Sequence, residues 1–69
     1  MKIIVVHDKY SNEPIIINAS AINAIRKAVD ETDEGKKEYS EIWVKSFVYP
    51  VKESIGAVMI KIKKAESEE

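Results

Sequence analysis

The stretch that decides the fold spans residues 40–51 and reads Ser40-Glu41-Ile42-Trp43-Val44-Lys45-Ser46-Phe47-Val48-Tyr49-Pro50-Val51. Its β-branched and aromatic residues predict two strands, and the pair Lys45-Ser46 is short enough to join them as a hairpin. That connection places Trp43 opposite Val48 on one face. The other face is more apolar and is the predicted core face, although a longer turn would exchange the two faces. The predicted core face consists of Ile42, Val44, Phe47, Tyr49 and Val51.

An amphipathic helix is predicted directly after this hairpin, from Ser54 to Lys64. Ser54 is a favourable N-cap residue, and the lysines near the other end complement the helix dipole. Ile60 falls on the side of the helix opposite the apolar stripe that would face the sheet. That stripe consists of Ile55, Val58, Met59 and Ile62. The sequence therefore predicts one domain over residues 1–64, followed by a frayed acidic tail at residues 65–69.

Two shorter apolar runs come first in the chain, at residues 3–6 and 14–17. Both runs are β-branched, and the polar residues 8–13 between them predict a hairpin. Pro14 suits the first position of a strand because it has no N–H to donate. Pro50 indicates in the same way that its strand lies at an edge or carries a bulge. Since the two runs do not alternate with polar residues, we expect both of their faces to be partly covered, and a second subunit could supply part of that cover.

The middle of the chain is less clearly patterned. Asn18 is a good N-cap residue, and Ile22, Ile25 and Val29 lie within about 60° on a helical wheel, which favours a helix. A strand would instead place Ile25 and Val29 on one face with Lys27 between them. Residues 30–38 are uniformly polar and carry seven charges, so they predict a solvated, mobile loop.

Composition limits what the protein can be. The 69 residues suffice for one small domain, and the absence of cysteine excludes disulfides and thiolate metal sites. Eleven basic and twelve acidic residues leave a net charge of -1, which does not favour nucleic acid or an anionic membrane as a partner. The apolar run at residues 3–6 is too short to span a bilayer or to form a signal-peptide core. We therefore expect a cytoplasmic protein.

No residues form a recognisable catalytic, cofactor-binding or metal-binding pattern. His7 is the single histidine, and no activated serine, threonine or cysteine can be placed beside it, so we interpret it as a strand-end histidine. The carboxylates at positions 30, 31, 33 and 34 lack the ligand spacing of a calcium loop. We interpret them as a solvated charge run, and the sequence predicts a protein that is not an enzyme and binds no cofactor.

The order of these segments resembles a known family. A strand hairpin, then Asn18-Ala19-Ser20-Ala21-Ile22, an apolar hairpin and a serine-capped helix is similar to the FlbD-like small proteins, named for flagellar and swarming phenotypes. The resemblance covers most of the chain. A looser similarity is to the first part of LytTR-type DNA-binding domains. The resemblance implies a single helical turn at residues 18–22, followed by a strand at residues 23–29.

Together these observations predict an α+β fold, with a small curved antiparallel sheet of four or five strands and a C-terminal amphipathic helix. The predicted function is a non-enzymatic interaction or adaptor module that self-associates or binds a protein partner. Trp43, Val48 and Ile60 are the candidate interface, because each lies off the main apolar face of its element. The alternative is a small nucleic-acid-associated regulator resembling a truncated LytTR-type domain. Its phosphate contacts would come from Lys61, Lys63 and Lys64.

Overall fold

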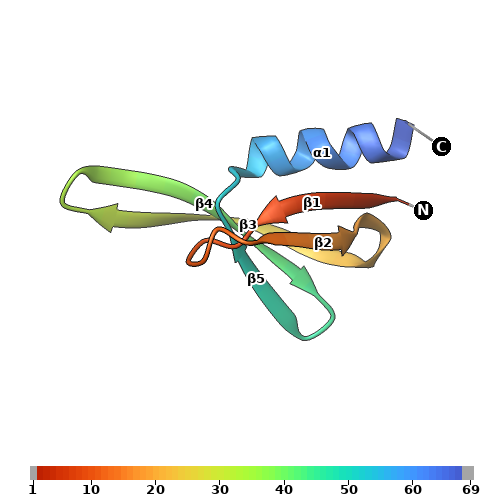
Figure 1. Ribbon diagram of the computed structural model, residues 1–69, viewed down its shortest axis with the longest axis horizontal. Coiled ribbons are helices and arrows are strands. Elements are labelled where there is room, and N and C mark those ends of the chain that lie inside the picture. The colour runs from red at the N-terminus through yellow and green to blue at the C-terminus, as the bar shows by residue number, and fades with distance from the viewer. Residues whose placement is uncertain (1, 68–69) are drawn as a thin grey trace.

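Residues 2–67 are described by the computed structural model, and within them the chain forms five strands, a 3-10 turn and a helix (Figure 1). The elements in order are β1 (Ile3–His7), β2 (Pro14–Asn18), η1 (Ala19–Ala21), β3 (Ile22–Thr32), β4 (Gly35–Val44), β5 (Phe47–Val51) and α1 (Ile55–Ser67). The α+β class is confirmed. The strands form two antiparallel sheets, β1–β2 and β3–β4–β5, so the prediction of one continuous sheet is only partly right.

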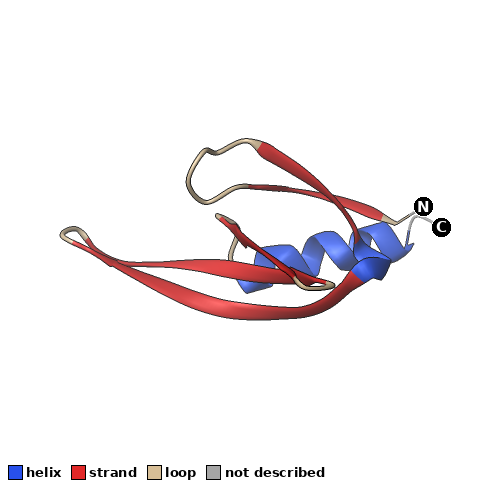
Figure 2. Ribbon diagram, turned by 90° about the horizontal axis from the view of Figure 1, so that it is seen from below, coloured by secondary structure: helices blue, strands red, loops and turns tan. Residues whose placement is uncertain are grey.

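The two sheets meet at one corner. An isolated antiparallel bridge joins Asp8, just after β1, to Val51 at the end of β5. Beside it, the Lys9 N–H donates to the Pro50 carbonyl at 2.9 Å. The pairing between the two sheets is limited to this corner, and from there the sheets diverge. The helix α1 lies against β1, β3 and β4 and so closes the space between the two sheets (Figure 2).

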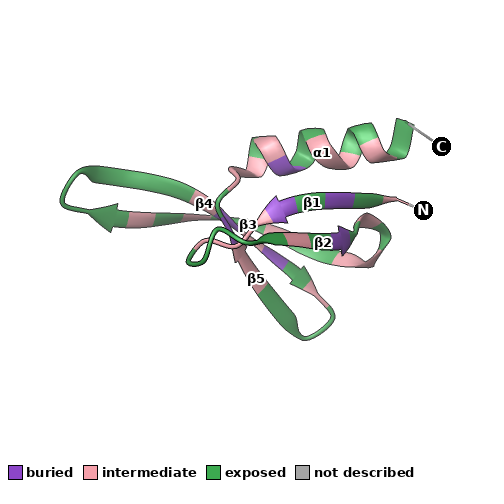
Figure 3. Ribbon diagram, in the orientation of Figure 1, coloured by how far each residue is buried: buried purple, intermediate pink, exposed green. Residues whose placement is uncertain are grey.

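The core fills this space and draws on both sheets and the helix. Figure 3 shows its buried positions gathered where the elements meet, while the far ends of the β3–β4 and β4–β5 hairpins are exposed. Each contributing element supplies one or two fully packed side chains. Among the described residues, the buried apolar ones are Ile4, Val6, Ile17, Ile42, Val51 and Val58.

The β4–β5 hairpin has the predicted register. Ile42 pairs with Tyr49, and Trp43 pairs with Val48, across the two-residue connection. Ile42 is fully buried, so the face predicted to form the core does so at the centre of the hairpin. The strand β5 is an edge strand, as Pro50 predicted, because an edge leaves one side of the strand without ladder bonds.

Two residues predicted to lie in the core are exposed instead. Phe47 is 65% exposed because it follows the turn at the tip of β4–β5, and this tip projects beyond the core (Figure 1). Met59 is 43% exposed. It lies about 100° around the helix from Val58, the buried contact residue, so it sits at the border of the packed side.

The ambiguous stretch is a strand, preceded by the single helical turn that the family resemblance implied. In η1 the Asn18 side chain acts as the N-cap, since its Oδ1 accepts the Ser20 N–H at 3.0 Å. The strand β3 then runs to Thr32. The helical periodicity of Ile25 and Val29 was misleading, because residues four apart share a face in a strand as well as in a helix.

Residues 30–38 are not the predicted mobile loop. They form the outer half of the β3–β4 hairpin, in which Asp30 pairs with Lys37 and Glu31 with Lys36. Opposite charges on facing positions stabilise such a ladder even without apolar side chains. Only residues 33–34 form the turn, and Gly35 takes up the left-handed φ of 122° that follows it.

The helix begins as predicted, with the Ser54 Oγ accepting the Ala57 N–H at 3.2 Å. It continues to Ser67, beyond Lys64 where the domain was expected to end. Ala65, the first residue of the predicted tail, packs against the core. Residues 68 and 69 of the predicted tail lie outside the described residues.

Candidate interaction surface

Trp43 and Val48 form a cross-strand pair on the face of the β3–β4–β5 sheet that points away from the core. Side chains alternate along a strand, so Trp43 turns outward where its neighbour Ile42 is buried. Ala24 of β3 pairs with Trp43 from the other side. Three apolar side chains thus form a row across the sheet, here called the Trp43 row. Within this row Trp43 is 36% exposed and Val48 is 40% exposed.

A β-bulge positions the row. The register of β3 against β4 shifts between Ile22 and Ala24, which leaves Asn23 without a partner in the ladder. The Asn23 side chain instead accepts the backbone N–H of Lys45 through its Oδ1. This hydrogen bond ties β3 to the turn of the neighbouring hairpin and therefore fixes the strands on both sides of Trp43.

Charged residues border the row. One step along the sheet, Arg26 pairs with Glu41 across β3 and β4, and Arg26 Nε lies 3.6 Å from Glu41 Oε1. The Arg26 side chain is 74% exposed and the Glu41 side chain 26% exposed. Such a long, solvated ion pair contributes little to stability. Both groups consequently retain capacity to bind opposite charges outside the chain.

Ile60, the third predicted interface residue, lies elsewhere. It is 58% exposed on α1, two positions from the buried Val58. Two positions are about 200° around a helix, so Ile60 points away from the sheets. The structure therefore brings Trp43 and Val48 together and leaves Ile60 on a different outer surface.

The three lysines proposed for nucleic acid are also divided. Lys61 and Lys64 line a shallow groove between α1 and β1, together with Ile3 and Val5. Lys63 does not line this groove, because it is about 200° around the helix from Lys61. They do not form a single row of cations.

A second apolar face, on the first hairpin, was not predicted as a site. The inner side of β1–β2 is buried through Ile4 and Ile17, which pair directly. On the outer side Ile3 is 47%, Val5 42% and Ile16 70% exposed, so the expected cover of both faces does not come from the described part of this chain. The unbroken β-branched runs at residues 3–6 and 14–17 did indicate that both faces of this hairpin are apolar. They did not indicate which of the two faces would be exposed.

His7 does stand at a strand end, and its partner is Glu53, just before α1. The backbone N–H of His7 donates to Glu53 Oε1 at 2.9 Å, and its Nδ1 lies 2.8 Å from Oε2. Burial of Glu53 disfavours its charged form and raises its pKa. The hydrogen bonds from His7 outweigh this effect, so the pKa of Glu53 lies below its ordinary value.

The acidic residues of the β3–β4 hairpin are engaged with lysines. Asp30 Oδ2 lies 3.0 Å from Lys9 Nζ, and Glu31 Oε1 lies 3.9 Å from Lys36 Nζ. Within residues 2–67, no three histidine, cysteine, aspartate or glutamate side chains are grouped so that they could hold a metal ion. In the same part of the chain, no helix combines the length and the apolar character needed to cross a membrane.

No family model, no curated protein and no solved structure matches this chain.

Proposed function

We propose that this protein is a non-enzymatic interaction module that self-associates through the outer face of its three-stranded sheet. The observation that carries the proposal is the Trp43 row, in which an exposed tryptophan lies between Ala24 and Val48 on the outer sheet face. Tryptophan is enriched among the residues that dominate binding energy in protein interfaces. We also propose that the chain belongs to the FlbD-like family, and this part of the proposal rests on the order of its strands, helical turn and helix.

The distribution of apolar side chains supports association. Within residues 2–67, ten large hydrophobic side chains are exposed, whereas six hydrophobic side chains are buried. A domain of this size has a small core, and covering exposed apolar surface with a partner adds stability that the core alone does not supply. Trp43 lies on the central strand of its sheet, because strands pair with β4 on both sides.

The charges beside the row favour a second copy as the partner. In a two-fold dimer each surface meets itself, and an isologous contact whose axis runs along the strands between β3 and β4 would bring Arg26 of one copy near Glu41 of the other. Opposite charges beside an apolar centre give such a contact specificity. The row with its charged border thus has the self-complementary character that a homodimer requires.

The test is sedimentation of the full chain over a range of concentrations. We expect a concentration-dependent dimer, and we expect Val48→Lys to weaken it by about tenfold or more, because a lysine at the centre must be desolvated. Val29→Lys is the matched control. Val29 is also an exposed strand valine, at 47%, and it lies on β3 opposite Glu38, away from the Trp43 row.

Two results would overturn the proposal. One is a chain that stays monomeric at every concentration. The other is a dimer that Val29→Lys weakens as much as Val48→Lys does. Circular dichroism on each variant shows that the fold is retained, so that a loss of association is not a loss of structure.

The nucleic-acid alternative predicts salt-dependent binding to duplex DNA that weakens when the three α1 lysines are neutralised. The position of Lys63, away from the groove that Lys61 and Lys64 line, does not favour it. The sedimentation experiment is therefore the first to carry out.

A further inference from the structure

A cleft of about 480 Å³ lies at the other end of the outer sheet face from the Trp43 row. Tyr39 and Trp43 are four residues apart on β4 and share that face, which separates the cleft from the row by about 13 Å along the strand. The segment after β1 and the residue after β5 complete the walls. The cleft is lined by Lys9, Asp30, Thr32, Lys37, Glu38, Tyr39 and Lys52.

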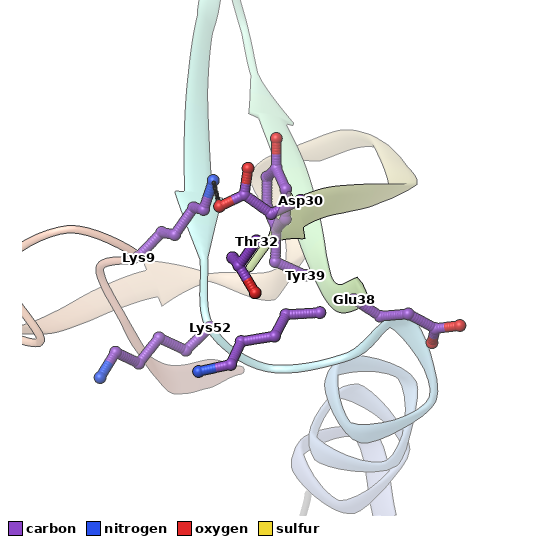
Figure 4. A pocket seen from close by; sticks show the side chains of 7 residues that line it. Lys9, Asp30, Thr32, Glu38, Tyr39 and Lys52 are labelled. Atoms are coloured by element: carbon purple, nitrogen blue, oxygen red, sulfur yellow. Dashed lines mark ion pairs between the residues drawn. The ribbon is translucent and has the colours of Figure 1, made fainter. Parts of the chain in front are cut away.

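One wall of the cleft is held rigidly. The Lys9 side chain is 15% exposed, its Nζ lies 3.9 Å from the centre of the Tyr39 ring, and it binds Asp30 Oδ2 at 3.0 Å (Figure 4). The hydrogen bond to Asp30 raises the pKa of Lys9, so this ammonium stays charged. The backbone bond from Lys9 to the Pro50 carbonyl fixes the same segment to β5.

The charges in the cleft do not cancel. Asp30 neutralises Lys9, and Glu38 is engaged by Lys27, whose Nζ lies 3.1 Å from Glu38 Oε1. The Glu38 side chain also points away from the Lys9–Asp30 pair (Figure 4). Among residues 2–67, Lys37 and Lys52 line the cleft without an ion-pair partner, which leaves two uncompensated positive charges in a concave site.

The backbones of these two lysines are fixed even though their side chains are exposed. Lys37 is held in the ladder opposite Asp30, and the Lys52 N–H donates to the His7 carbonyl at 2.9 Å. The two lysines thus line the cleft from β4 and from the residue after β5. Two cationic side chains that line one cleft suit a doubly charged anion, and lysine commonly binds phosphate as a point charge.

We propose that this cleft binds the phosphate group of a small phosphorylated molecule, between Lys37 and Lys52. The cleft volume falls within the range of small-ligand sites. A phosphate group carries nearly two negative charges at neutral pH and so matches the uncompensated charge of the site. This inference is independent of self-association, because the Trp43 row contributes no residue to the cleft.

The test is an NMR titration of the isotope-labelled full chain with inorganic phosphate, at constant ionic strength maintained with chloride. We expect saturable amide shifts confined to Lys9, Lys37, Tyr39 and Lys52. Lys37→Ala and Lys52→Ala should each weaken binding by about tenfold, as expected for the loss of a hydrogen bond to a charged group.

Lys36→Ala is the matched control and should leave the affinity unchanged. Lys36 is the neighbouring lysine, but it points to the opposite face of the hairpin, where it lies near Glu31. Shifts that do not saturate, or an equal loss of affinity in Lys36→Ala, would overturn the proposal. So would a short DNA duplex that binds the same residues more tightly than phosphate does, because the ligand would then be a polymer backbone.

Discussion

Ser40 and Glu53 join three elements of the chain through side-chain hydrogen bonds. Ser40 is fully buried, and its Oγ donates to the Glu53 carbonyl at 2.8 Å. The Glu53 carboxylate in turn accepts from His7 at the end of β1. A carboxylate can only accept hydrogen bonds, so the His7 Nδ1 carries the hydrogen while Glu53 is ionised. These few atoms connect β4 and β1 to the start of α1.

This junction predicts how stability depends on pH. Because the folded state lowers the pKa of Glu53, ionised Glu53 stabilises the fold at pH values above the unfolded glutamate pKa of about 4.3. That contribution is lost as the pH falls through the lower, folded pKa. Chemical denaturation at a series of pH values should therefore show stability falling on acidification, and less steeply in Glu53→Gln, which has no charge to lose.

Glu13→Gln serves as the control for this measurement. Glu13 is an exposed glutamate in the segment between β1 and β2, and its substitution should leave the acid-side slope unchanged. A Glu53→Gln variant whose stability falls as steeply with acid as that of the parent chain would show that the His7–Glu53 contact does not lower the carboxyl pKa.

At the scale of elements, the turn of the β4–β5 hairpin is strained at one residue. Lys45 adopts a φ of 58°, whereas Ser46, the other residue of the turn, does not have a positive φ. A two-residue hairpin turn with a positive φ at its first residue favours glycine there. The sequence supplies lysine instead, and the hydrogen bond from its N–H to Asn23 helps to hold this conformation.

We predict that Lys45→Gly stabilises the protein by up to about 1 kcal/mol. The left-handed conformation costs a non-glycine residue roughly 1–2 kcal/mol, and glycine removes this cost. Glycine also loses more conformational entropy on folding, which offsets about half of the gain. Thermal unfolding should register a rise in Tm of a few degrees. Ser46→Gly is the matched control and should lower Tm, since it gains flexibility without relieving strain. A lower Tm in both variants would contradict the turn geometry.

The same hairpin shows what the sequence could predict about the fold. A two-residue connection at Lys45-Ser46 predicted Trp43 opposite Val48, while a longer turn, which would have exchanged the faces, stayed open until the structure showed the register. Residues 22–29 could not be assigned from the sequence, because residues four apart satisfy both helical and strand periods. The prediction of a mobile loop at residues 30–38 was wrong for another reason. Their strand pairing depends on opposite charges meeting across the ladder, which a hydropathy pattern does not register.

The candidate surface was predictable residue by residue but not as a whole. Alternation from Ile42 and Val51 placed Trp43 and Val48 on the outer face, and the helical wheel placed Ile60 away from Val58. Whether these residues share a surface depends on how α1 crosses the sheets, and no local pattern encodes that crossing. The phosphate cleft was missed for the same reason, since Lys9, Lys37 and Lys52 come from three separate segments.

At the scale of the whole molecule, the chain is extended for its size. Its dimensions are 43 × 24 × 20 Å, and the β3–β4 hairpin projects from the rest (Figure 1). A compact monomer of 7.8 kDa is expected to expose about 4,400 Å². This chain exposes 4959 Å², an excess that agrees with apolar surface left open to a partner.

The fluorescence of Trp43 tests self-association most directly, because it is the one tryptophan in the chain. The measurement is the emission maximum and the acrylamide quenching of the full chain, from dilute to concentrated protein. Self-association through the Trp43 row predicts that the emission moves to shorter wavelength and that quenching decreases as concentration rises, because the half-exposed indole becomes buried. An emission maximum and a quenching constant that stay the same over the whole range would contradict it.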